Sequence, residues 1–69
     1  MLYGKIIDID SQTQIAQVEQ DLNKRVFDFA FDLWEDEISD LQKGVEVEFV
    51  VEMKKVVKIH LKPKPVDPD

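Results

Sequence analysis

The chain has 69 residues, 15 acids against 9 bases, a net charge of −6 and no cysteine. This length allows one small domain with a single apolar core and leaves little room for a large cofactor site. The lack of cysteine and of any apolar run of about 20 residues excludes disulfides, thiolate metal sites and a membrane-spanning helix in this sequence.

The predicted strands are five short segments in which apolar side chains alternate with polar ones. The clearest alternation places Val47 and Phe49 on one face of an extended segment, and Glu46 and Glu48 on the other. Clusters of turn-forming residues separate most of the segments. In chain order the predicted strands are residues 5–10, 15–19, 25–31, 44–51 and 56–61.

The third segment contains three phenylalanines, and its register follows from the cost of each choice. If Phe27, Phe29 and Phe31 face inward, Asp28 lies on the wet face. The opposite register buries Asp28 without a partner and exposes three aromatic rings. We therefore predict that the phenylalanines lie in the core.

Irregularities are expected at the first segment but not at the last. Ile6 and Ile9 both face inward only if a bulge lies near Asp8. In the last segment Val57 and Ile59 alternate with lysine and histidine, so we predict that both valine and isoleucine face the core.

The stretch between the third and fourth strands has helical signals. Residues 32–35, with the sequence DLWE, have the form of a capping box, which predicts a helix that begins there and ends near Gly44. Trp34, Ile38 and Leu41 follow the i, i+4, i+7 spacing of one helical stripe. We predict that this stripe plugs one end of the core.

These elements predict an all-β fold: a five-stranded Greek-key barrel of the OB type, with one short helix between strands three and four. An SH3-like barrel also has five short strands, but it has no place for that helix. The barrel domain spans residues 1–61. Three prolines predict a tail or linker over residues 62–69.

The sequence also resembles the cold-shock domain family over most of residues 3–61. Four segments carry the resemblance: GKIIDID at residues 4–10 resembles G-K-V-K-W-F-N, IAQV at residues 15–18 resembles G-F-G-F-I, VFDF at residues 26–29 resembles V-F-V-H, and LQKGVEVEF at residues 41–49 resembles L-x-x-G-x-x-V-x-F. Members of that family bind single-stranded nucleic acid by stacking bases on outward aromatic side chains, so the resemblance implies this function.

The departures from the family pattern fall on the stacking residues. Asp8 stands where the family has tryptophan, and Ile15 and Gln17 stand where it has two phenylalanines. Phe27 and Phe29 match the platform positions of the third strand, although the register above places them in the core. The resemblance therefore implies a binding surface that has lost most of its aromatic platform.

The positive charge is concentrated late in the chain. Residues 1–53 hold 13 acids and 4 bases, whereas residues 54–64 hold 5 bases and no acids. This basic strip can follow a phosphate backbone, or it can be the wet face and edge protection of an ordinary terminal strand. The strip and the resemblance together give these candidate nucleic-acid-binding residues: Lys5, Ile15, Gln17, Phe27, Phe29, Lys54, Lys55, Lys58 and His60.

Two functions fit these observations. The first is a non-enzymatic module that binds single-stranded RNA or DNA weakly. The second is a protein-interaction or accessory domain that has lost nucleic-acid binding and forms the N-terminal part of a longer protein, including a membrane protein. No enzyme, cofactor or metal site is expected, because His60 is the single histidine and no nucleophile–base pair appears. We expect a cytoplasmic protein, or a cytoplasmic domain of a larger one, that does not itself span a membrane.

Overall fold

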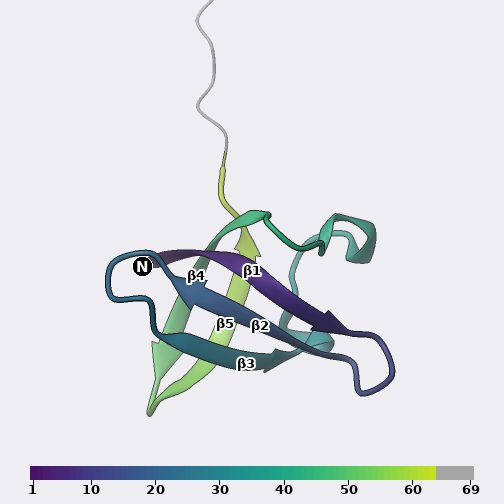
Figure 1. Cartoon of the computed structure of the whole chain (residues 1–69), viewed down its shortest axis with the longest axis horizontal. Coiled ribbons are helices and arrows are strands. Elements are labelled where there is room, and N and C mark those ends of the chain that lie inside the picture. The colour runs from purple at the N-terminus through teal and green to yellow at the C-terminus, as the bar shows by residue number, and fades with distance from the viewer. Residues whose placement is uncertain (64–69) are drawn as a thin grey trace, which may run out of the picture.

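The computed structural model describes residues 1–63 as five β-strands and two short 3-10 turns (Figure 1). The elements are β1 (Leu2–Asp10), β2 (Ile15–Gln20), β3 (Val26–Ala30), η1 (Phe31–Leu33), η2 (Ile38–Asp40), β4 (Glu46–Glu52) and β5 (Lys55–Leu61). All five predicted strands are therefore present. The predicted tail begins at Lys62, whose amide donates to the carbonyl of Glu46 at 3.1 Å, and its residues 64–69 lie outside the described part of the chain.

The strands form one antiparallel sheet in the order β3-β2-β1-β4-β5. The sheet curls so that β3 and β5, the two ends of this order, approach one another (Figure 1). Within residues 1–63 no ladder of backbone hydrogen bonds joins β3 to β5. The all-β fold is confirmed, and its sheet is strongly curved without being closed.

The inner face of the curled sheet carries the apolar core. Val47 and Phe49 on β4 are fully buried, as the alternation predicts, and Phe29 on β3 is 3% exposed. Phe27 and Phe31 are half-buried and pack against the core. The inward register of the third strand is therefore confirmed, and it follows from the cost of burying Asp28.

Two features of β1 shape the sheet. The register against β2 shifts between Ile6 and Asp8, which confirms the expected bulge. Gly4 lies so close to β2 that a Cβ at this position would overlap the carbonyl oxygen of Glu19, and it would also press on the Phe49 ring at 3.1 Å. The close approach of the two strands therefore requires glycine at position 4.

The predicted helix after β3 is wrong. The chain instead forms η1 and η2, and no side chain caps either turn. Trp34 has extended backbone between them, where it makes an isolated parallel bridge to Ile59 of β5. The backbone amide of Glu35 donates to the Ile59 carbonyl at 3.1 Å. Pairing with β5 holds this segment extended, because one or two helical turns alone are only marginally stable.

The burial of the predicted helical stripe is confirmed in part. Trp34 is 8% exposed and Leu41 is 6% exposed, so both belong to the core. Ile38 is 57% exposed, because the 3-10 turn does not keep the i, i+4 spacing of an α-helix. Trp34 and Leu41 thus cover one end of the inner face without a helix.

The predicted inward position of Val57 is also wrong. Val57 is 41% exposed, and its neighbour Val56 is buried instead. The register between β4 and β5 shifts between Val50 and Val51, so the two sides of β5 exchange places at this point. A strict period of two cannot anticipate a bulge inside a strand.

Candidate nucleic-acid interface

The nine residues predicted to bind nucleic acid fall into three separate groups. The first group, Lys5, Ile15 and Gln17, lies on the outer face of β1 and β2. Lys5 stands in register between Glu19 and Glu46, so an acidic residue neighbours it on each adjacent strand. This environment opposes the binding of a phosphate.

The amide of Gln17 is already used within the sheet. Its Nε2 donates to Oδ1 of Asp28 at 2.8 Å. Ile15 is 37% exposed and offers an apolar patch in place of an aromatic ring. The outer face of β1 and β2 therefore has none of its three predicted residues in a state suited to stacking a base.

The second group is Lys58 and His60 on β5. Nε2 of His60 lies 3.4 Å from Oε2 of Glu48 on β4, and Nζ of the neighbouring Lys62 lies 4.0 Å from Oε2 of Glu46. Cross-strand acids thus accompany His60 and Lys62, whereas Lys58 stands opposite Val50 and has no ion pair between described residues. On β5 the strip has the character of an ordinary wet face.

The third group, Phe27, Phe29, Lys54 and Lys55, is brought together by the fold. These four residues line one hollow between β3 and the start of β5. Phe29 is buried, so its ring is out of reach of a ligand. Phe27 is half-buried, and its ring centroid lies 5.9 Å from that of Phe49 with the ring planes at 59°. Only Phe27 offers part of an aromatic surface there.

Two basic residues that the sequence prediction missed lie at the same end of the sheet. Arg25 lines a second hollow together with Phe27 and Lys54. Lys24 precedes Arg25 in the turn between β2 and β3. The Lys-Arg pair directly before an aromatic strand is a sequence signal that could have identified these residues. Their proximity to Lys54 is not visible in the sequence, because it depends on β3 and β5 starting at the same end of the sheet.

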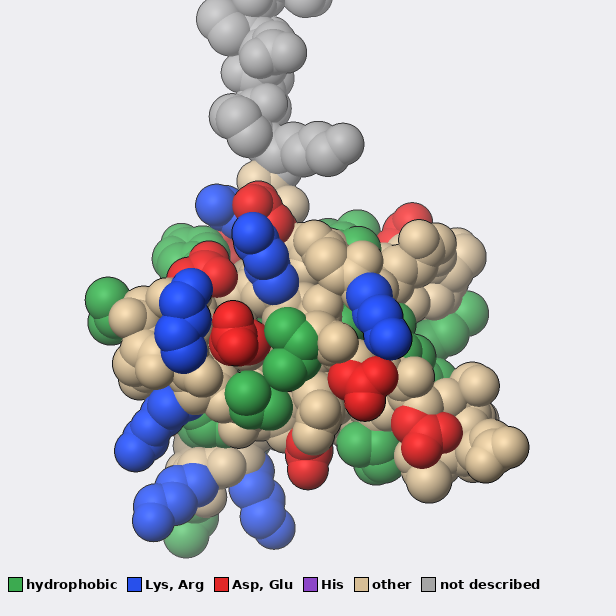
Figure 2. Space-filling view, in the orientation of Figure 1, with side chains coloured by type: hydrophobic (Ala, Val, Ile, Leu, Met, Phe, Trp, Pro, Cys, Tyr) green, Lys and Arg blue, Asp and Glu red, His purple; other side chains and the backbone are tan. Residues whose placement is uncertain are grey.

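We call the four exposed cations Lys24, Arg25, Lys54 and Lys55 the basic end. None of them takes part in an ion pair between described residues, unlike Lys43 and Lys62, although Lys55 stands opposite Glu52 in the β4–β5 register. Figure 2 shows Lys and Arg side chains gathered at the lower left of the molecule, where the β4–β5 hairpin projects. The basic end thus combines positive charge, concave shape and part of one aromatic ring.

The turns that carry these cations have unusual backbone. Lys24, Met53 and Lys54 have φ of 61°, 52° and 66°, in the left-handed region that residues with a Cβ seldom adopt. Met53 and Lys54 are the two central residues of the β4–β5 hairpin, a geometry that normally uses Asn-Gly. This hairpin tip therefore carries a long apolar and a long basic side chain where stability alone favours small ones.

Two further features are absent from residues 1–63. No group of three or more metal-binding side chains gathers in this part of the chain. None of its helical turns is long and apolar enough to cross a bilayer.

Comparison with models of known families, with curated proteins and with solved structures finds no match to this chain.

Proposed function

We propose that the chain is a small binding module for single-stranded nucleic acid, and that it binds through the basic end. The observation that carries the proposal is the group of four cations, none of them in an ion pair between described residues, at the same end of the sheet as the half-buried ring of Phe27. Lysine and arginine bind phosphates, and an aromatic face binds unstacked bases. The curled five-stranded sheet also supports the proposal, since its strand order is that of an OB-type barrel.

The expected affinity is low. A single partly buried ring and four flexible cations supply much less than a full stacking platform, and the net charge of −6 repels nucleic acid at long range. We expect a Kd of about 10–100 µM at low salt, within the usual range of non-specific binding.

Fluorescence polarisation with labelled oligo-dT and oligo-rU of about 10 nucleotides tests the proposal, since this length spans one OB-type site. The double variant Lys54→Ala with Lys55→Ala should bind at least about 5-fold more weakly. Its salt dependence should flatten by a slope of about 1.4, which corresponds to two lost phosphate contacts on a single strand.

The matched control is Lys43→Ala with Lys62→Ala, which changes the net charge equally but removes lysines already paired with Asp8 and Glu46. This control should stay within about 2-fold of the wild type, because paired surface lysines release few counterions from nucleic acid. Equal weakening of both variants, or no binding by the wild type at about 200 µM protein, well above the expected range, would refute the proposal.

A second candidate function is binding of a protein partner, and the outer face of the sheet favours it. Tyr3, Ile7, Ile15 and Val26 are between 37% and 48% exposed there. Apolar side chains of this kind are found in protein interfaces. Loss of oligonucleotide binding in the basic-end variant alone would argue against this candidate.

A further inference from the structure

Gln20 is a polar residue buried inside the open end of the sheet. It ends β2 and is 7% exposed. Its backbone is held on both sides: its amide donates to the carbonyl of Arg25 at 2.7 Å, and its carbonyl accepts from the amide of Lys24 at 2.9 Å. The backbone of Gln20 is therefore held by the same turn that carries two cations of the basic end.

The carboxamide of Gln20 has no protein partner. None of the side-chain hydrogen bonds between described residues involves it. No fully enclosed side-chain nitrogen or oxygen in that part of the chain lacks a partner, so the carboxamide must reach the small exposed part of the residue. The carboxamide is therefore open to solvent at this point, and a ligand that enters there can take the place of that solvent.

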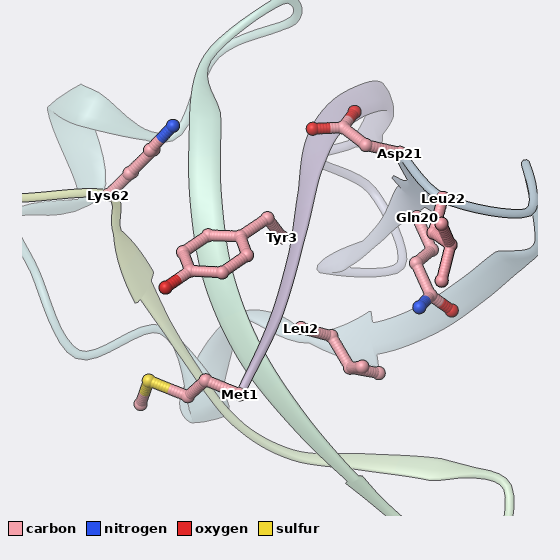
Figure 3. Close-up of a pocket in the computed structure, with 7 residues that line it drawn as sticks. All are labelled: Met1, Leu2, Tyr3, Gln20, Asp21, Leu22 and Lys62. Atoms are coloured by element: carbon pink, nitrogen blue, oxygen red, sulfur yellow. The ribbon is translucent and has the colours of Figure 1, made fainter.

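Gln20 lies between two hollows, and both Gln20 and Leu2 line each of them. One hollow, of ≈ 600 Å³, is also lined by Arg25, Phe27 and Lys54. The other, of ≈ 530 Å³, lies on the side of Tyr3, where Figure 3 shows the Gln20 carboxamide beside Leu2 and Leu22. Both hollows have the size of small-ligand sites.

We propose that the Gln20 carboxamide hydrogen-bonds the edge of one unstacked nucleobase that enters the hollow beside Phe27. This inference rests on the proposed function, because the strand must first be held at the basic end. A base edge presents a donor next to an acceptor, and a carboxamide presents the complementary pair. The apolar side chains of Leu2 and Phe27 contact the faces of the base, while Arg25 and Lys54 contact the flanking phosphates.

This arrangement makes Gln20 the residue that distinguishes a base from bare backbone. The cations alone bind any polyanion equally, since phosphate contacts carry no information about the base. A base that hydrogen-bonds Gln20 replaces the solvent that its amide faces in the free protein. The binding of one base should therefore depend on this single side chain.

The test compares homopolymeric DNA oligonucleotides of each base with an abasic oligonucleotide of equal length and charge. We expect the wild type to prefer at least one base over the abasic strand by about 5- to 100-fold, the range of a bidentate amide contact. Gln20→Met keeps the length of the side chain and removes its amide. This variant should lose the preference while its affinity for the abasic strand stays unchanged.

The control variant is Gln12→Met, the same change in the exposed turn between β1 and β2, and it should keep the preference. If the wild type binds all strands, the abasic one included, with equal affinity, base reading by Gln20 is wrong and the proposed function still stands. If the wild type binds no strand, both proposals fail.

A measurement on the wild type alone covers the case in which Gln20→Met does not fold. Nucleoside monophosphates should shift the side-chain amide resonances of Gln20 in NMR spectra, and ribose 5-phosphate should not. If a capped dipeptide shifts these resonances and no nucleotide does, the hollow binds a peptide and the proposal is overturned.

Discussion

The inner face of the curled sheet has two ends that differ in what covers them. At one end Trp34 and Leu41 are buried, and Nε1 of Trp34 donates to the carbonyl of Glu37 at 2.8 Å. At the other end Phe27 is only half-buried, and the carboxamide of Gln20 makes no hydrogen bond to another residue within 1–63. In Figure 1 the segment after β3 and the tip of the β4–β5 hairpin lie on opposite sides of the sheet. One end is covered by packed side chains, whereas the other is open to solvent.

The largest effect should come from opening the covered end. Trp34→Ala removes a buried ring and its hydrogen bond, and it should lower the free energy of unfolding by about 3–5 kcal/mol. A domain of this size is only marginally stable, so the variant should be largely unfolded at 37 °C. Urea denaturation followed by circular dichroism measures this change. A loss below about 1 kcal/mol, the typical cost of an average substitution, would show that Trp34 does not hold this end.

An equivalent truncation at the open end should cost less. Phe27→Ala removes a ring that is already partly in water, so we expect a loss of about 1–2.5 kcal/mol, roughly half that of a fully buried ring. The same urea experiment measures it. Oligonucleotide binding should weaken together with stability, since Phe27 supplies the exposed aromatic surface at the basic end. A cost equal to that of Trp34→Ala would erase the contrast between the two ends.

Substitutions at the hairpin tip should make the protein more stable and weaken its binding to oligonucleotides. Replacing Met53 by Asn and Lys54 by Gly puts residues that accept positive φ at both central positions, which should raise the free energy of unfolding by about 1 kcal/mol. Oligonucleotide binding should fall, because one cation of the basic end is lost. Thermal melts and polarisation titrations of the same sample check both effects. A variant that binds better as it becomes more stable would contradict the role of Lys54.

The smallest effect should come from Ile38, which sequence analysis placed beside Trp34 in a buried stripe. Because Ile38 is 57% exposed, Ile38→Ser should change the free energy of unfolding by less than about 0.5 kcal/mol, as surface substitutions usually do. Denaturation with urea resolves this difference. A cost near that of a core residue would indicate that the α-helix forms after all.

Much of the fold follows from local patterns. The alternation of apolar side chains located all five strands, and the cost of burying Asp28 set the register of β3 correctly. The helix after β3 was wrong because Trp34 pairs with Ile59, which is 25 residues further along the chain. Val57 was misplaced for a related reason, since the bulge opposite Val50 depends on how β4 and β5 pair. Both errors arise from contacts between strands, which local patterns do not contain.

The candidate site was less accessible to sequence analysis than the fold. Lys54 and Lys55 were identified. His60 was grouped with them because the carboxylate of Glu48 lies across the sheet on β4 and is distant along the chain, whereas Lys58 stands opposite Val50 and has no ion pair between described residues. Arg25 has a local signal in the Lys-Arg pair that precedes β3, but Gln20 has no motif of its own. Both residues line one hollow with Lys54, because the end of β2, the start of β3 and the tip of the β4–β5 hairpin lie close together. Only the three-dimensional structure shows this arrangement.

The placement of Trp34 supplies an optical reporter within the chain. It is the single tryptophan, and it lies at the covered end beside Ile59. Its fluorescence emission should therefore change when the protein denatures. The emission should stay constant when a ligand binds in the hollow near Gln20, at the opposite end of the sheet. Quenching of this indole during a titration would indicate contact elsewhere on the surface, or a movement carried along β5.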